Sequence, residues 1–167
     1  MTQYFHAIDP RDEIFCHNVG LAKGCLRAVS LRREAMPELG GLRSPYEVYT
    51  LEAEKEAVLE AVRLKEFPHA PSRMGAIYLF ASAEDAAAAN EKWWQGARVV
   101  LAASIVETSR FGSFDAAYLD APPEGWDAAA RSYWRGHVTN QPQIEVIVEG
   151  VVQLHGWEPY ARLLSGS

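Results

Sequence analysis

The chain opens with a short apolar segment, Tyr4–Ile8, that is followed at once by residues typical of a helix start. Aromatic and apolar residues over this length predict a β-strand. Asp9 can cap the N-terminus of a helix, Pro10 suits the first helical position, and Gly20 is typical of a helix end. The start of the chain therefore predicts a strand, a short helix and a turn at residues 19–21.

Three further elements are predicted in the middle of the chain. In segment 50–65, Thr50 can act as a cap, apolar residues recur on one face, and Glu and Lys fall on the other, which predicts an amphipathic helix. The run AIYLF at residues 76–80 predicts a strand. Ser82 can then cap a helix that extends to Trp94, with acidic residues in its first turn.

The last third of the chain is richer in strand patterns. The apolar and β-branched run RVVLAASIVE at residues 98–107 predicts a buried strand. Asp127 can cap a short helix, AAARSYWR. Residues 143–148 and 151–155 predict two strands, and the Glu149–Gly150 pair between them predicts a tight two-residue hairpin.

These elements do not alternate regularly as strand, helix, strand. Helices gather early and strands late, which favours the α+β class with a mostly antiparallel or split sheet and flanking helices. The length of 167 residues suits one domain. Residues 1–167 are therefore predicted to form a single domain.

Composition is that of an ordinary globular protein, with 49% hydrophobic and 23% charged residues. The formal net charge of −6 provides no bulk attraction to nucleic acid. Arg27, Arg32 and Arg33 could still form a local basic patch, although a solvated basic segment is the simpler interpretation.

Neither the cysteines nor the first residues indicate export or a membrane. Cys16 and Cys25 are too few and too widely spaced for a disulfide framework or a CxxC site. The first residues lack the basic head and apolar run of a signal peptide, and no run of about 18 apolar residues occurs. The expected location is therefore the cytoplasm, without a membrane partner.

Several well-marked chemical motifs are absent from the sequence. It contains no GxxxxGK[ST] loop, no GxGxxG fingerprint and no GxSxG elbow. The HExxH pattern and the deaminase pattern are absent as well. The spacing of the cysteines and histidines matches no zinc site, so no metal is expected.

Three residues in the predicted strands are candidates for a functional site. His6 shares a strand face with Tyr4 and Ile8, and Tyr78 offers an apolar ring face with a polar tip. Glu145 interrupts an apolar strand, where a charge is costly unless it lines a cleft. Each also has a simpler interpretation: a core histidine, a core tyrosine and a carboxylate on an exposed strand face.

The order of these three residues resembles the histidine–tyrosine–glutamate class of the ADP-ribosyltransferase superfamily. YFHAIDP, followed by a short helix and VGL, resembles the opening strand of that class and the turn after it. IYLFASAEDAAA resembles the middle strand with its alanine-rich helix, and QIEVIVEG with VVQLHGW resembles the glutamate strand and the closing strand. The likeness is clearest to small bacterial and phage members, including DarT-like DNA-modifying toxins and proteins of the DUF2441 type.

The resemblance implies an ADP-ribosyltransferase-like split sheet and an activity that uses NAD. Such enzymes cleave the bond between nicotinamide and ribose and transfer ADP-ribose to a macromolecular acceptor, either a protein or a nucleic acid. Glu145 would be the catalytic carboxylate that stabilises positive charge on the ribose. His6 would bind the ribose on the adenosine side, and Tyr78 would stack on nicotinamide.

Other positions gain a role only from this resemblance. Gly20 would let the backbone approach NAD closely, since glycine has no Cβ. Arg73 would donate to the pyrophosphate, although a surface arginine is the alternative. Gln143, two residues before Glu145 on the same strand face, would meet the acceptor. Segment 26–71 has no counterpart in the class and could be a helical insert, such as a lid or a target-recognition element.

Other functions stay open at this point. An NAD-dependent RNA 2′-phosphotransferase has a similar core, although the acidic balance is unfavourable for it, and a binding module could keep the fold without activity. An interaction domain could instead use aromatic residues, which are interpreted mostly as core: Trp93, Trp94, Trp126, Tyr133 and Trp134. Small transferases of this kind occur as toxins or phage effectors, so an inhibitor or antitoxin is a further potential partner.

Overall fold

The structure is a computed structural model that describes residues 2–39, 41, 43 and 52–162. Five strands occur in these residues: β1 Tyr4–Ile8, β2 Cys25–Arg27, β3 Ile77–Leu79, β4 Val99–Asp115 and β5 Ile144–Leu154. Five α-helices accompany them: α1 Glu13–Leu21, α2 Val29–Ala35, α4 Ala53–Glu66, α5 Ala83–Trp94 and α6 Trp126–Trp134. The strands pair antiparallel, which confirms the α+β class with an antiparallel sheet and flanking helices.

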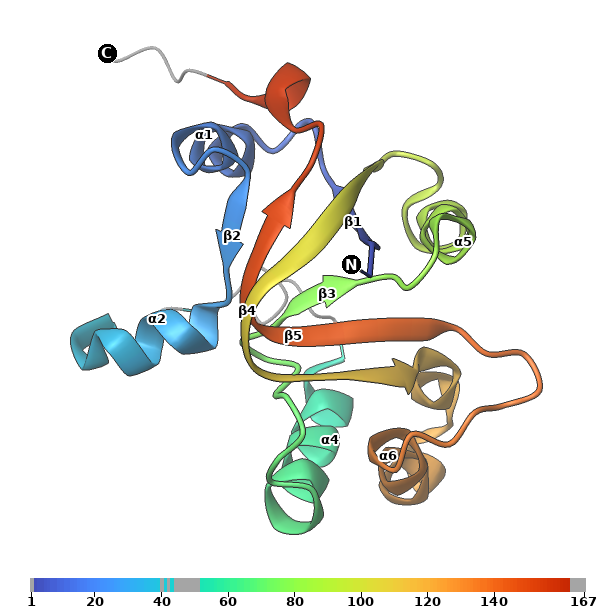
Figure 1. The fold of residues 1–167 in the computed structure, drawn as a ribbon. Helices are drawn as coiled ribbons and strands as arrows, with labels where there is room; N and C mark the ends of the chain where they lie inside the picture. Colours follow the sequence, from blue (N-terminus) through green and yellow to red (C-terminus); the bar gives the residue numbers. More distant parts are fainter. Residues whose placement is uncertain (1, 40, 42, 44–51, 163–167) are drawn as a thin grey trace.

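The sheet is built on the long pairing between β4 and β5, which curve together (Figure 1). β1 adds to the first part of β4. β3 and β2 pair with successive stretches of β5, Val146–Val148 and Val151–Gln153. Phe5 and Phe80 exchange two backbone hydrogen bonds, 3.0 and 2.8 Å long, so that β1 also meets the end of β3. The sheet therefore curls until β1 and β3 lie side by side.

β5 is one continuous strand, so the predicted hairpin at Glu149–Gly150 is wrong. Gly150 pairs with Thr108, between two irregularities in the register of β4. A Cβ atom at this position would lie 2.1 Å from the backbone oxygen of Glu107. The glycine therefore allows a close approach of two strands where the pairing bends, and it does not reverse the chain.

β4 is longer than the sequence pattern indicates, because it extends to Asp115 instead of ending at residue 107. Its second half, TSRFGSFD, contains glycine and aspartate, which are depleted in strands. Phe111 is 51% exposed in this half, whereas Phe114 is buried. Only one side of this half therefore contributes to a core, which accounts for its weak apolar pattern.

Helix α1 begins and ends later than predicted. Asp12 is the N-cap in place of Asp9, because its carboxylate accepts a hydrogen bond of 2.9 Å from the backbone N–H three residues later. Gly20 lies inside the helix. The chain reverses instead at Lys23 and Gly24, which have φ angles of 51° and 79°.

Helices α5 and α6 lie close to their predicted positions. Ser82 caps α5 as expected, since its hydroxyl accepts a hydrogen bond of 3.0 Å from the backbone of Asp85. The N-cap of α6 is Gly125, so the predicted cap at Asp127 is wrong. Asp127 lies in the first turn, where a negative charge still favours the helix dipole.

Helix α4 lies largely within the predicted segment 50–65, although Thr50 is outside the described residues. The predicted separation of its faces is partly wrong, because Lys55, Glu56 and Arg63 are 7%, 2% and 4% exposed. Both basic residues form ion pairs with glutamates of the same region, and Glu56 pairs with an arginine of the loop before β3. Their charges are thus compensated inside the protein, as burial requires.

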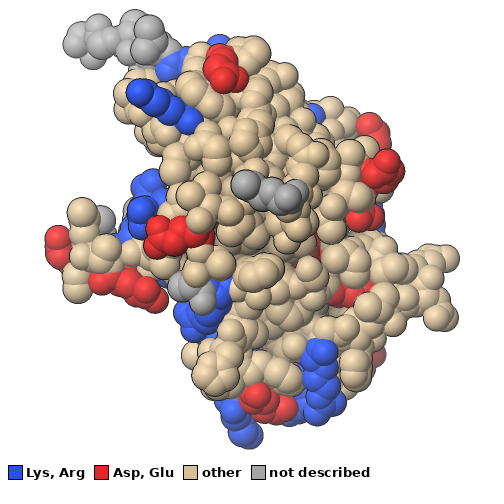
Figure 2. All heavy atoms as spheres, in the orientation of Figure 1, with Lys and Arg blue, Asp and Glu red and all other residues tan. Residues whose placement is uncertain are grey.

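Helix α2 projects from the body of the protein as an arm (Figure 1). None of its residues is buried. Figure 2 shows basic side chains on both sides of this arm and acidic side chains toward its tip. Arg32 and Arg33 of the expected basic segment belong to this helix. Its surface therefore carries charge and contributes no residue to the hydrophobic cores.

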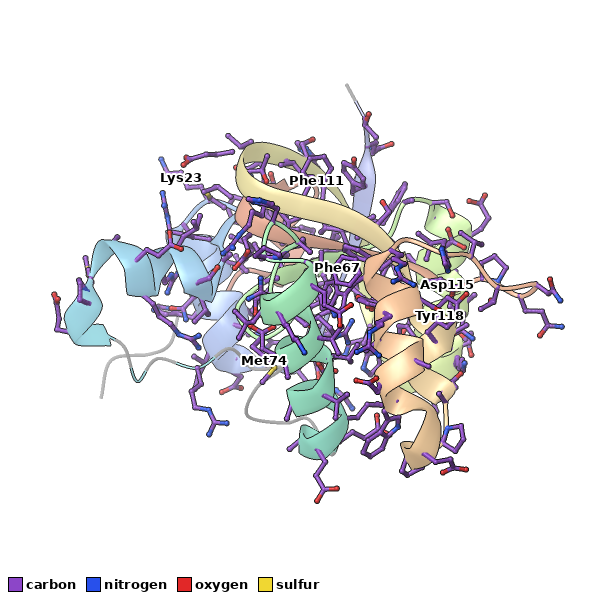
Figure 3. The ribbon with its side chains drawn as sticks, turned by 90° about the horizontal axis from the view of Figure 1, so that it is seen from below. Lys23, Phe67, Met74, Phe111, Asp115 and Tyr118 are labelled. Carbon is purple, nitrogen blue, oxygen red and sulfur yellow. The ribbon has the colours of Figure 1, made fainter. Side chains whose placement is uncertain are left out.

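Two hydrophobic clusters occupy opposite faces of β5. Val146 and Val148 belong to the cluster that α1 and β1 share, whereas Ile147 belongs to the cluster that α4 and α6 share. Figure 3 shows α4 and α6 side by side, with the curved sheet across their upper ends. Phe67, directly after α4, packs against the second cluster. Alternation along one buried strand thus supports two cores.

We expect Gly150→Ala to lower the free energy of unfolding by about 2–3 kcal/mol, because the added Cβ forces the backbones of β4 and β5 apart. Gly125→Ala is the matched control, since a Cβ there has its nearest neighbour at 3.8 Å. Urea unfolding of both variants measures the difference. Equal stability of Gly150→Ala and the unsubstituted protein would contradict the account of the bend.

Candidate functional site

A cavity of about 760 Å³ lies where β1, β3 and the start of β5 meet the first two helices and α5. Five of the predicted site residues line it: His6, Arg73, Tyr78, Gln143 and Glu145. They come from three strands that are far apart in the sequence and from the loops that precede β3 and β5. The curled sheet therefore brings together residues that the sequence patterns identified separately.

Gly20 is the predicted site residue that does not line this cavity. It lies within α1, and a Cβ atom there would approach the side chain of Ala161 to 3.2 Å. Its small size serves the contact between α1 and the residues that follow β5. The predicted approach of Gly20 to NAD therefore has no geometric basis.

His6 is fixed by a hydrogen bond of 2.8 Å between Nδ1 and the backbone oxygen of Tyr78. Burial lowers the pKa of His6 below its ordinary value of 6.5, and the charge of Arg98 also lowers it, while the bond to Tyr78 opposes both. The ring is therefore neutral near pH 7. Since a carbonyl oxygen can only accept, Nδ1 carries the proton and Nε2 is an acceptor for a ligand hydroxyl.

Two contacts with Arg73 fix the side chain of Tyr78. Its hydroxyl donates a hydrogen bond of 2.6 Å to the backbone oxygen of Arg73. Its ring centroid lies 5.3 Å from the guanidinium carbon of Arg73, within cation–π distance. The half-buried ring therefore forms a fixed part of the cavity wall.

Glu145 is 6% exposed and lines the cavity, which excludes an exposed strand face as its environment. Its Oε1 atom accepts a hydrogen bond of 2.6 Å from the Tyr133 hydroxyl and forms an ion pair with Nη1 of Arg73. Its Oε2 atom accepts no hydrogen bond from the described residues. One oxygen is thus anchored, and the other is available to a ligand.

Arg73 links this carboxylate to a second one. Its Nε atom donates to both oxygens of Glu56, at 3.2 and 3.0 Å, and Nη1 donates to the Tyr133 hydroxyl at 2.8 Å. Burial opposes the charge of Arg73, but Glu145 and its other neighbours raise its pKa well above the ordinary value. Nε and Nη1 are therefore engaged within the protein, and the predicted contact with a pyrophosphate stays a prediction.

Glu56 and Tyr133 hold residues of the site in place, and sequence reasoning missed both. Glu56 matched the polar face of an amphipathic helix, and Tyr133 matched a core aromatic residue. Burial raises the pKa of Tyr133 well above its ordinary value, so its hydroxyl is protonated and can donate. No local pattern distinguishes a solvated glutamate from one that meets a buried arginine 17 residues later.

Asp115 fixes the loop that leads into β5. It is 1% exposed and accepts hydrogen bonds from three backbone N–H groups, among them that of Gln143 at 2.8 Å. Burial alone would raise the pKa of Asp115, but the hydrogen bonds together lower it by more than burial raises it. The pKa of Asp115 therefore lies below its ordinary value. Figure 3 shows Asp115 at the end of β4. The ionised carboxylate therefore positions Gln143, whose side chain accepts a hydrogen bond of 2.9 Å from Lys92.

A smaller cavity of about 190 Å³ adjoins the first one and shares Phe80, Trp93 and Gln143 with it. The rest of its wall is mostly apolar: Ala88, Ala89, Pro142 and Ile144, with Asp85 and Lys92 as polar members. Trp93 is 41% exposed, so its interpretation as a core residue is wrong. The predicted acceptor residue, Gln143, thus lies between two cavities.

Arg98 is a further cationic residue of the cavity that the sequence did not single out. The side chain of Asn90 holds its backbone through two hydrogen bonds, 2.9 and 3.0 Å long. Its guanidinium lies 5.1 Å from the ring centroid of Trp94 and 4.0 Å from the carboxylate of Asp9. Its buried Nε atom has no hydrogen-bond partner among the described residues. Arg98 can therefore donate to a ligand near His6.

The described residues provide neither a metal-binding cluster nor a membrane-spanning helix. Residues 2–39, 41, 43 and 52–162 contain no group of three or more His, Cys, Asp or Glu side chains that could hold a metal ion. Over the same ranges, no helix has the length and apolar character needed to span a bilayer.

The chain is thus an antiparallel α+β protein whose cavity carries a buried carboxylate, a neutral histidine and a tyrosine. The family described as "Protein of unknown function (DUF2441)" matches residues 33–157, and the chain belongs to this family. The matched part includes β3, β5 and most of segment 26–71, whereas β1 with His6 precedes it. No curated protein matches the chain.

The lowered pKa of His6 predicts a pH dependence of stability. Because the folded-state pKa lies below 6.5, the unfolded chain binds the proton first on acidification, and stability falls as the pH drops below about 6.5. We expect His6→Asn, which can still donate to the Tyr78 backbone, to lose less stability than the unsubstituted protein between about pH 7.5 and about pH 5.5. Urea unfolding at both pH values measures this. An equal loss in both proteins would contradict a neutral His6 in the folded protein.

Proposed function

We propose that the protein is an NAD-dependent mono-ADP-ribosyltransferase of the histidine–tyrosine–glutamate class. The observation that carries this proposal is the meeting of His6, Tyr78 and Glu145 at one cavity, in which a single oxygen of the carboxylate is left for a ligand. The resemblance of the three strands to this class supports the same assignment. The chain's antiparallel α+β fold is compatible with it.

The size and charge of the cavity suit a dinucleotide. Its volume of about 760 Å³ lies within the range of about 300–1,000 Å³ that is usual for small-molecule sites. The side chains of Arg27 and Arg32 line it and form no hydrogen bond or ion pair with the part of the chain that the structure describes. Arginine binds phosphate groups through several N–H donors. In this proposal, these two side chains would neutralise a pyrophosphate.

His6 and Tyr78 would orient the two nucleosides of NAD. The acceptor nitrogen of His6 suits a ribose hydroxyl, and the fixed ring of Tyr78 suits stacking on nicotinamide. Both side chains are held by backbone hydrogen bonds before any ligand enters, which lowers the entropic cost of forming the site. This part of the proposed site is therefore pre-formed.

The proposed chemical step is cleavage of the glycosidic bond of NAD. The bond between ribose C1′ and the nicotinamide nitrogen breaks, its electron pair stays on nitrogen, and neutral nicotinamide leaves. Positive charge grows on the ribose, and the free Oε2 atom of Glu145 accepts a hydrogen bond from the ribose 2′-hydroxyl and stabilises that charge. A nucleophilic atom of the acceptor then bonds to C1′ and releases its proton to water.

The acceptor would enter beside Gln143. This residue lies between the large cavity and the small apolar one, and Lys92 fixes its side chain. An acceptor group in the small cavity would therefore lie next to the strand that carries Glu145. The acceptor is a macromolecule, either protein or nucleic acid, and an inhibitor or antitoxin that covers this entrance would block the enzyme.

We expect Glu145→Gln to lower the rate of nicotinamide release from NAD by at least about a hundredfold, the usual effect of removing one electrostatic catalytic group. The fold should survive, because the amide oxygen can still accept from Tyr133 and the charge of Arg73 stays balanced by Glu56. The release is measured with purified protein, with and without cell lysate as a source of acceptor.

Glu149→Gln is the matched control for this test. Glu149 is a buried glutamate of the same strand that pairs with Arg110 and does not line the cavity. Full activity of Glu145→Gln with loss in Glu149→Gln would move the catalytic role to Glu149. Binding of NAD without release under any condition would identify a binding module without transferase activity.

We expect His6→Ala and Tyr78→Ala to weaken NAD binding by about tenfold or more each, since each removes a group that orients the ligand. Calorimetric titration of the Glu145→Gln background with NAD measures binding without turnover. His155→Ala serves as control, because His155 is exposed, bonds to Ser104 and does not line the cavity. Unchanged affinity in both cavity variants would remove this site from consideration.

A further inference from the structure

Four side chains from four separate elements form one buried polar group, of which Arg73 and Glu145 line the cavity and the other two do not. Glu56 of α4, Arg73 of the loop before β3, Tyr133 of α6 and Glu145 of β5 are 2%, 3%, 0% and 6% exposed. Their hydrogen bonds run from Glu56 through Arg73 to Glu145, and Tyr133 bonds to the last two. We refer to these four residues as the carboxylate clamp.

Stability alone gives a weak reason for such a group. Removing ionised side chains from water costs several kcal/mol for each ion, and apolar residues of similar volume are often equally stable in their place. The clamp also lies beside aromatic residues, since Tyr133 stacks on Phe114 with ring centroids 4.9 Å apart. Apolar side chains in place of these four residues would also be compatible with this environment.

The geometry of the clamp instead restricts one carboxylate. Arg73 and Tyr133 both contact Oε1 of Glu145, so the rotation of the carboxylate is fixed by two donors. Arg73 itself is held by a two-oxygen contact with Glu56. The whole arrangement orients Oε2 without touching it, as far as the described residues are concerned.

We propose that Glu56 and Tyr133 are positioning residues that act through Arg73 and Glu145 to hold Oε2 in its reactive orientation. This inference rests on the proposed function, in which Oε2 accepts the ribose 2′-hydroxyl. Glu56 and Tyr133 do not line the cavity, so they touch neither NAD nor acceptor. Their contribution therefore appears in the rate of the chemical step and leaves the binding of NAD unaltered.

The first test compares Glu56→Gln with Glu66→Gln. Both remove a carboxylate of α4 that pairs with an arginine, but Glu66 pairs with Arg131 of α6 and has no link to Glu145. We expect Glu56→Gln to lower kcat for nicotinamide release about tenfold or more, with the KM for NAD unchanged within about twofold. Glu66→Gln should leave both constants unchanged. A kcat of Glu56→Gln equal to that of the control overturns the inference.

Tyr133→Phe provides a second variant that keeps the aromatic packing and removes only the hydroxyl. Its kcat should also fall about tenfold with KM unchanged, and combining it with Glu145→Gln should cause no further loss, because it acts through Glu145. A further loss in the double variant would show an independent role. Loss of kcat in Glu145→Gln but in neither Glu56→Gln nor Tyr133→Phe would refute the positioning role and keep the proposed function.

A structural measurement tests the same inference without activity. Crystal structures of Glu56→Gln and Tyr133→Phe should show the Glu145 carboxylate rotated or in two conformers, whereas Glu66→Gln should retain the single orientation. An unmoved Glu145 in both clamp variants overturns the inference, whatever the activity of the protein. Absence of nicotinamide release from the unsubstituted protein would refute the proposed function separately.

Discussion

The bent pairing of β4 with β5 is the constraint on which the rest of the structure depends. Because Gly150 lets the two backbones approach at the bend, β5 can pair with β3 before it and with β2 after it. A backbone bridge then joins the end of β3 to β1. The strands that carry His6, Tyr78 and Glu145 thereby face one cavity. A flat sheet with the same strands would separate these side chains.

The sequence predicted the elements of this fold better than their connections. β1, β3 and α5 followed from short apolar runs and from the cap at Ser82, which are local features, and the α+β class followed from the order of the elements along the chain. The bend at Gly150 was read as a hairpin, because a glycine that reverses the chain and one that permits close strand contact look alike in sequence. What separates them is the backbone of β4, about forty residues earlier in the chain.

The candidate site was accessible to sequence reasoning only where a residue broke a pattern. Glu145 interrupts an apolar strand, and it does line a cavity. Glu56, in contrast, fits the polar face of a helix, and its burial follows from the docking of α4 against α6. Arg98 directly precedes an apolar strand, and no sequence pattern distinguishes it. Its place in the site depends on its contacts with Asn90 and Trp94 in the folded protein. Contacts that form only in the folded protein decide these roles.

The closed contacts within the carboxylate clamp constrain how relatives of this protein can diverge. Loss of one member leaves a buried charge or donor without its partner, whereas replacement of the whole set by apolar residues can be neutral. Single substitutions at these positions are therefore expected to be unfavourable intermediates, and we expect the four residues to change together among relatives. A lineage that gave up Glu145 would be released from keeping Arg73 and Glu56 as well. Co-variation at these positions would then separate the branches of the family that retain the carboxylate from those that have abandoned it.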